Sequence, residues 1–232
     1  ISIIISLMTT LLMSFHDNIT FFIVVRFLSG LSSAFVLIFG TSLILPSIQA
    51  FGKKSLSTAH FMGVGFGIVL SSILVSVLGS LGFEWDELWI GVTILSVILA
   101  IPIFVNTPDE SIISTTNINS NVKNNLGFTL ITIAYGLYGF GYVVLGTFIS
   151  AMARETIGLE STEFYVWLLV GLAGIPMVIF WPWFGKKIGN DIALFFACAI
   201  MSLGILMPVL LENKFGITLA SILLGSTFPA FR

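Results

Sequence analysis

The sequence has few charged residues and almost none of the residues that build metal sites or disulfides. Charged residues make up 9% of its 232 residues, against about 25% in an ordinary soluble domain. The single cysteine, Cys198, excludes an internal disulfide and a cysteine-built zinc site. With 9 basic and 11 acidic residues, the chain has no basic field for nucleic acid. It carries no HExxH motif, phosphate-binding loop or histidine cluster, so we expect no enzyme, no metal and no cofactor.

Long apolar runs fill most of the chain, because apolar residues account for 57% of it. They form eight segments, 1–14, 18–46, 57–82, 88–105, 126–153, 164–184, 192–211 and 215–231. Arg26 is the one charged residue inside these segments. A bilayer-spanning helix needs about 20 apolar residues, which the internal segments approach. The segments also lack the alternation of a membrane strand. The sequence therefore predicts an all-α, polytopic helical membrane protein.

The polar segment 106–125 divides these helices into two groups. It holds 20 residues rich in asparagine, serine and threonine, and a structureless loop of that length is uncommon inside a compact domain. We interpret it as a cytoplasmic linker between two helical bundles, 1–105 and 126–232. The first apolar run is too short to span a bilayer, and the last ends at Arg232 after about 17 residues. We therefore expect a chain truncated at both ends.

The lysines indicate which connections face the cytoplasm. Alternate connections must lie on the same side of the membrane. One set, 47–56, 106–125 and 185–191, carries Lys53, Lys54, Lys123, Lys186 and Lys187. The other set carries only Arg154 and Lys214. The excess of positive charge predicts that the first set is cytoplasmic.

Several local motifs resemble the major facilitator superfamily. Arg26, Gly30 and Ala34 match a pattern that its members commonly carry in helix 4. Gly63 and Gly67 match part of a helix 5 pattern. The run YGLYGFGYVVLGTFISAMAR, residues 135–154, and the run HFMGVGFGIVLSS, residues 60–72, resemble helices 7 and 5 of its YbfB/YjiJ-type group.

This resemblance implies a major facilitator-like two-bundle architecture, built from three-helix repeats. Residues 1–105 then correspond to late helix 3 through helix 6, and residues 126–232 to helix 7 through helix 10. It also implies secondary active transport of an unidentified small solute across a bacterial inner membrane by alternating access. The expected partners are that solute, with proton coupling left open, and the lipid bilayer; the full-length protein is expected to be a monomer. A non-transporting membrane sensor or scaffold with the same helical shell is the alternative.

Arg26 is the first candidate site residue. It lies about 12 Å into its helix, and a cation at such a depth costs at least about 2.5 kcal/mol on insertion scales. One interpretation is that Arg26 faces a central cavity and binds an anionic group of the substrate, or pairs with a carboxylate elsewhere in the protein. The other is a structural role, in which it bonds main-chain carbonyls or extends toward the membrane surface.

Three tyrosines follow one face of the segment 126–153. Tyr135, Tyr138 and Tyr142 recur at i, i+3 and i+7, so their hydroxyl groups lie along the same side of a helix. We interpret them as lining a solute path, with Tyr142 as the first candidate. Aromatic packing between helices is the alternative for each of them.

The remaining candidates are one histidine, a set of small residues and three tryptophans. His60 is a candidate for proton coupling, with a plain interfacial residue as the alternative. Five positions with small side chains are expected to pack against neighbouring helices: Gly30, Ala34, Gly63, Gly67 and Ser71. Trp167, Trp181 and Trp183 stand near the ends of segment 164–184, so we expect most of them to anchor that helix at the membrane interface.

Overall fold

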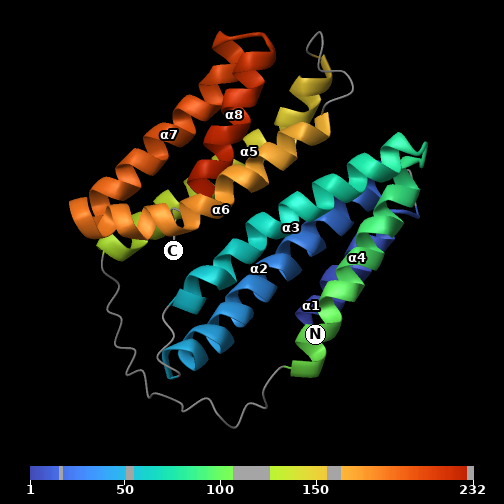
Figure 1. Cartoon of the computed structure of the whole chain (residues 1–232), viewed down its shortest axis with the longest axis horizontal. Helices are drawn as coiled ribbons and strands as arrows, with labels where there is room; N and C mark the ends of the chain where they lie inside the picture. Colours follow the sequence, from blue (N-terminus) through green and yellow to red (C-terminus); the bar gives the residue numbers. More distant parts are fainter. Residues whose placement is uncertain (16–17, 51–54, 107–125, 156–162, 229–232) are drawn as a thin grey trace. The chain divides into compact units, whose positions relative to one another are not determined.

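The structure, a computed structural model, describes residues 1–15, 18–50, 55–106, 126–155 and 163–228. The regular elements in these residues are helices, as Figure 1 shows. They are α1 (Ser2–Leu12), α2 (Ile19–Ala50), α3 (Ser55–Ser80), α4 (Trp85–Asn106), α5 (Leu126–Glu155), α6 (Glu163–Ile188), α7 (Asn190–Leu210) and α8 (Lys214–Thr227). Each matches one apolar segment of the sequence, so the all-helical fold class is confirmed.

The six helices α2 to α7 are long and apolar enough to cross a membrane. Large apolar side chains on these helices stay exposed, among them Phe27, Ile98, Phe140 and Phe195. In water this exposure costs about 25 cal/mol for each Å² of apolar surface, whereas in lipid it costs nothing comparable. Because helices satisfy their own main-chain hydrogen bonds, they can cross the bilayer without unpaired polar groups.

Hydroxyl side chains inside the helices are satisfied by their own main chain. Ser32, Ser72, Thr93 and Ser221 each donate to a carbonyl oxygen three or four residues earlier. This bonding hides a polar group from lipid at the cost of a slight local bend. Among the described residues, every buried side-chain nitrogen or oxygen has a hydrogen-bond partner.

Tight connections join α3 to α4 and α6 to α7. Gly82 has a φ of 86°, the left-handed conformation that glycine adopts without strain. It ends α3 in a Schellman motif, in which Phe83 donates to the Leu78 carbonyl at 3.2 Å and Gly82 to that of Gly79 at 3.1 Å. Gly189, with a φ of 97°, is the single residue between α6 and α7. Both lysines expected in a loop there, Lys186 and Lys187, lie instead in the last turn of α6.

Contacts divide the chain into two compact units. The first comprises Ile1–His60 and Ile73–Thr115, and the second comprises Phe61–Ser72 and Thr116–Arg232. The middle of α3, Phe61–Ser72, is thus grouped with the second unit, and both ends of this helix belong to the first. The bounds of the two bundles expected from the sequence, 1–105 and 126–232, stay a prediction. All of the expected linker, 106–125, except Asn106 lies outside the described residues.

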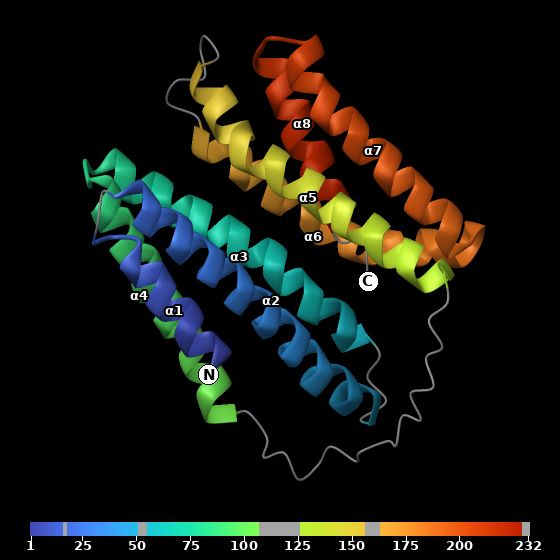
Figure 2. The same cartoon turned by 180° about the vertical axis from the view of Figure 1, so that it is seen from behind.

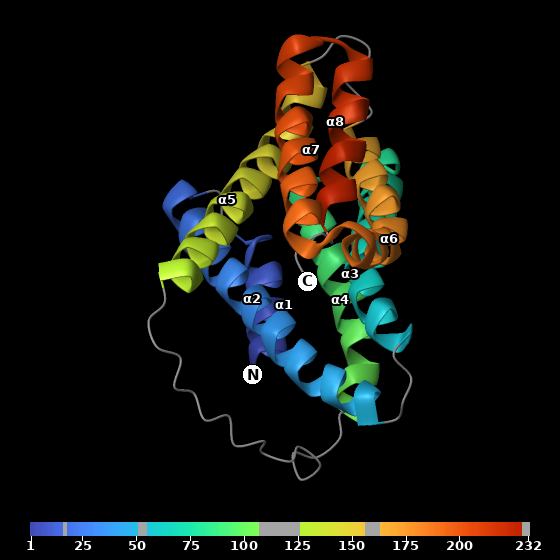
Figure 3. The ribbon, with the colours of Figure 1, turned by 90° about the vertical axis from the view of Figure 1, so that its left-hand side faces the viewer.

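Each unit has its own packing. In the first unit, α1 packs against α2 and α4, as Figure 2 shows. In the second unit, α8 packs against α6 and α7 and more lightly against α5; Figure 3 shows α7 and α8 side by side. The core of the second unit consists of Leu145, Ile149, Ala153, Val166, Val170, Met201, Ile217, Ala220 and Leu224. This core holds α8 between the longer helices.

Candidate functional site

Arg26 lies over an aromatic ring of a neighbouring helix. Its guanidinium carbon is 5.0 Å from the centroid of the Trp89 ring on α4. One turn earlier on both helices, the rings of Phe22 and Trp85 are 6.0 Å apart. The two pairs run in the same order along α2 and α4, so these helices run parallel to one another. In each pair one side chain comes from α2 and the other from α4, and the two pairs lie one helical turn apart.

The contact with Trp89 places the guanidinium carbon of Arg26 over the indole ring. A cation over an indole ring is stabilised by about 0.5 to 2 kcal/mol, which offsets part of the cost of placing Arg26 inside the span. Among the described residues, no carboxylate pairs with Arg26. Its side chain is exposed, so the five N–H donors of the planar group remain available to an anion.

The three tyrosines of α5 differ in their surroundings. Tyr138 is half-buried, and its hydroxyl donates to the main-chain carbonyl of Thr227 on α8 at 3.0 Å. The ring of half-buried Tyr142 lies 5.6 Å from that of Phe228. Tyr135 is 57% exposed. Tyr138 and Tyr142 thus contact the end of α8, whereas Tyr135 lies on the open surface of its unit.

His60 lies next to a hydroxyl group of α2. Its Nε2 atom is 3.2 Å from Oγ1 of Thr41, a hydrogen bond whose direction depends on the tautomer of the ring. The side chain of His60 is half-buried near the start of α3. This bond holds the imidazole in a fixed position between two helices of the first unit.

Comparison with protein families decides which class of protein this is. The family model described as an uncharacterised MFS-type transporter, YbfB, matches residues 1–232. The chain belongs to this family of major facilitator transporters. The transporter is therefore a multi-pass membrane protein with a small-molecule substrate, and its family is not a family of enzymes. Among curated proteins, none matches the chain.

The small residues expected to pack face open space within the described part of the transporter. A Cβ atom placed at Gly30, Gly63 or Gly67 meets no described atom within 4 Å. Ala34 is exposed, and the hydroxyl of Ser71 donates to the Ile68 carbonyl of its own helix. Their packing role stays a prediction.

Other glycines make the close helix contacts of the second unit. A Cβ at Gly171 on α6 would lie 3.0 Å from the carbonyl oxygen of Gly65 on α3. A Cβ at Gly225 on α8 would overlap the main chain of Val170 on α6. These crossings bring main chains close together, as small residues at a helix interface permit. Neither crossing is predictable from the sequence, because glycine spacing shows which positions share a face of a helix but not which face meets a neighbouring helix.

The three tryptophans of α6 differ in their surroundings, and their anchoring at the membrane interface stays a prediction. Trp181 is 5% exposed and donates its indole N–H to the carbonyl of Ser226 at 2.7 Å. Trp167 donates to the hydroxyl of Ser150 on α5 at 2.9 Å. Trp183 is 50% exposed, and the Lys187 ammonium lies 4.2 Å from its ring centroid. The indole N–H groups of Trp167 and Trp181 thus have hydrogen-bond acceptors on neighbouring helices, as buried or half-buried indoles usually do.

The transporter has no metal centre in the part of the chain that the structure describes. No group of three or more histidine, cysteine, aspartate or glutamate side chains there is able to hold a metal ion. Polar features within the candidate spans include Arg26 with Trp89 and His60 with Thr41 in the first unit, and the tyrosines of α5 in the second. Their chemistry is that of hydrogen bonding and charge pairing with a small molecule.

Proposed function

We propose that the protein carries out secondary active transport of a small solute with an anionic group, across a bacterial inner membrane, by alternating access. The observation that carries this proposal is the contact between Arg26 and Trp89, 5.0 Å from guanidinium carbon to ring centroid. A cation kept inside a membrane span is expensive and marks a functional position by default. The family match supports the same reading.

Arg26 binds the anionic group in this proposal. The indole of Trp89 lies under the guanidinium group, and in this proposal the exposed N–H groups of Arg26 bind the solute. A carboxylate or phosphate accepts two parallel hydrogen bonds from a guanidinium group, which gives both affinity and orientation. Lysine offers a point charge without this fork, and Arg26→Lys is therefore expected to bind the solute more weakly.

Tyr142 is the second proposed contact. The hydroxyl of Tyr138 already donates to Thr227, whereas that of Tyr142 has no hydrogen bond with the residues that the structure describes. A phenol offers apolar area and one hydrogen bond, both suited to the uncharged part of a solute. Tyr135 stays a proposed contact nearer the start of α5.

A comparison of small molecules in cells with and without the full-length protein tests the proposal. We expect at least one anionic metabolite to change its distribution between cells and medium. Cells that carry an Arg26→Gln variant at equal membrane abundance serve as the matched control, and their metabolite distribution should equal that of cells without the protein. An unchanged set of metabolites under every growth condition, together with altered gene expression, favours a non-transporting sensor instead.

A further inference from the structure

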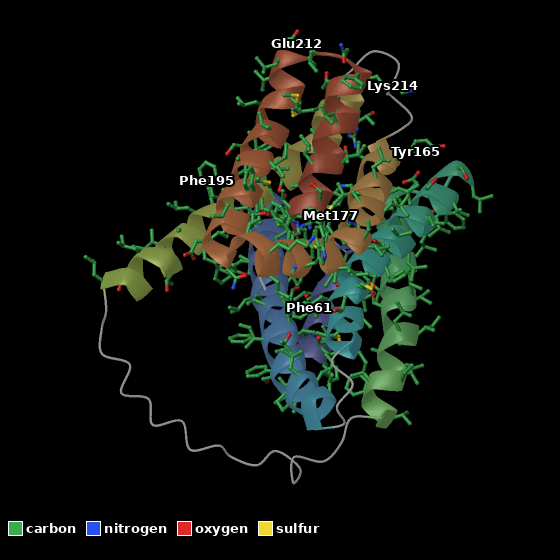
Figure 4. All side chains as sticks on the ribbon, turned by 60° about the vertical axis from the view of Figure 1, so that its left-hand side comes forward. Phe61, Tyr165, Met177, Phe195, Glu212 and Lys214 are labelled. Carbon is green, nitrogen blue, oxygen red and sulfur yellow. The ribbon has the colours of Figure 1, made fainter. Side chains whose placement is uncertain are left out.

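A cavity lies at one end of the second unit, where α5 and α7 end and α8 begins. Its volume is about 780 Å³. Its lining includes Met152, Glu155, Val209, Glu212, Lys214 and Ile217. Figure 4 labels Glu212 and Lys214 at the turn between α7 and α8. The transport mechanism proposed above uses none of these residues.

The lining of this cavity carries charged side chains of both signs. Glu155 and Glu212 supply two carboxylates and Lys214 supplies one ammonium, and the side chains of all three are exposed. Among the described residues, none of the three forms an ion pair. A complementary ligand carries an ammonium group for the carboxylates and an anionic group for the lysine. The excess of one carboxylate favours a ligand whose amine has N–H groups to donate.

The apolar part of the lining indicates what else the complementary ligand contains besides its charged groups. Met152, Val209 and Ile217 are apolar, and Val209 is 63% exposed. The candidate spans Thr132–Glu155 and Asn190–Leu210 both end at this cavity. Its charged rim therefore lies at the membrane boundary and its apolar wall lies within the span. A ligand that fits both has a polar head and an apolar tail.

We propose that this cavity binds the headgroup of an amine-bearing zwitterionic phospholipid of the phosphoethanolamine type. The ligand ammonium lies between the carboxylates of Glu155 and Glu212, and the phosphate lies against the ammonium of Lys214. The acyl chains continue along Val209 into the bilayer. Headgroups without an amine leave the two carboxylates unpaired beside a phosphate, and a choline headgroup has no N–H to donate to them. This site is separate from Arg26 and does not depend on transport.

Lipid retention by the full-length protein tests this proposal. The protein is reconstituted in vesicles of equal parts phosphatidylethanolamine and phosphatidylglycerol, extracted in detergent, and its retained lipids are counted by native mass spectrometry. We expect phosphatidylethanolamine to be enriched over its share. The variants Glu155→Gln and Glu212→Gln should each lower the enrichment about fivefold, the effect of one charge near a membrane surface. Lys214→Gln should lower it as well.

Glu84→Gln is the matched control, because Glu84 is an exposed carboxylate just before α4 and outside this cavity. Its enrichment should equal that of the wild type, and circular dichroism should give all variants the same helix content. Equal retention of the two lipids by the wild type, or an equal loss in Glu84→Gln, overturns the proposal. So does displacement of the retained lipid by soluble phosphoethanolamine at matched concentration, since the site then takes a free solute.

Discussion

Trp181 on α6 donates its indole N–H to the main-chain carbonyl oxygen of Ser226 on α8, at 2.7 Å. The next carbonyl, that of Thr227, accepts the hydroxyl of Tyr138 on α5 at 3.0 Å. The last carbonyls of a helix have no partner within it, and lipid offers none. Side chains from two neighbouring helices thus satisfy the end of α8 and fix its position against them.

Replacing Trp181 should therefore destabilise the second unit. Trp181→Phe keeps most of the apolar volume but leaves the Ser226 carbonyl without its donor. Hydrogen bonds between membrane helices contribute about 0.6 kcal/mol on average and up to about 1.7, so we expect a loss of about 1 kcal/mol. Thermal unfolding of the full-length protein in detergent measures it. Trp183→Phe is the control and should change the unfolding temperature less, because Trp183 is half exposed.

The crossing at Gly225 should tolerate no larger side chain. A methyl group there would overlap the main chain of Val170, and a main chain cannot move aside as a flexible side chain does. We expect Gly225→Ala to destabilise the protein by about 1 to 3 kcal/mol. Gly139→Ala on α5, where a Cβ meets no described atom within 4 Å, should be neutral or stabilising by up to about 1 kcal/mol. Equal unfolding temperatures for the two variants would contradict this crossing.

The sequence predicted the helices well because a bilayer imposes a length and a composition that can be read directly. Segment 192–211 became α7, Asn190–Leu210, to within two residues. Charged residues extend several helices beyond the apolar runs, as in α6, which continues through Lys186 and Lys187 to Ile188. Lysine stems are apolar and their ammonium groups reach water from a helix end. A segment drawn from hydropathy therefore ends before its helix does.

Contacts between helices were beyond what one sequence predicts. Arg26 was singled out from its charge alone, but Trp89 is 63 positions away along the chain and nothing in the spacing joins the two. Gly63 and Gly67 recur at a spacing of four residues and so share a face of α3. The residue of α3 that closely approaches α6 is instead Gly65. Which face of a helix meets a neighbour depends on the packing of all the helices together.

His60 gives a prediction on pH. Histidine changes its charge between about pH 5 and 8, and the bond to Thr41 at 3.2 Å holds its ring in place. If His60 takes up the coupling proton, His60→Gln should remove most of the dependence of the transport rate on pH in this range. His16→Gln is the control and should retain it. A wild-type pH profile in the His60 variant would exclude His60 from coupling.

The predicted topology is tested by the reaction of introduced cysteines. In a Cys198→Ser background, Ser114→Cys within the linker should react with a membrane-impermeant thiol reagent only after the cells are opened. Phe83→Cys, in the connection between α3 and α4, should react in intact cells, because that connection belongs to the opposite set. The reverse pattern would place the linker outside the cell and would invert the orientation assigned from the lysines.

Transport by the purified full-length protein is the most direct test of the central claim. Proteoliposomes are loaded with the anionic solute that the metabolite comparison identifies, and its exchange is followed over time for the wild type and Arg26→Gln. A hydrogen bond to a charged group contributes about 2 kcal/mol, so the variant should exchange the solute about 30-fold more slowly. Equal exchange at equal reconstituted protein would show that Arg26 does not bind the solute, and no exchange by the wild type would contradict transport itself.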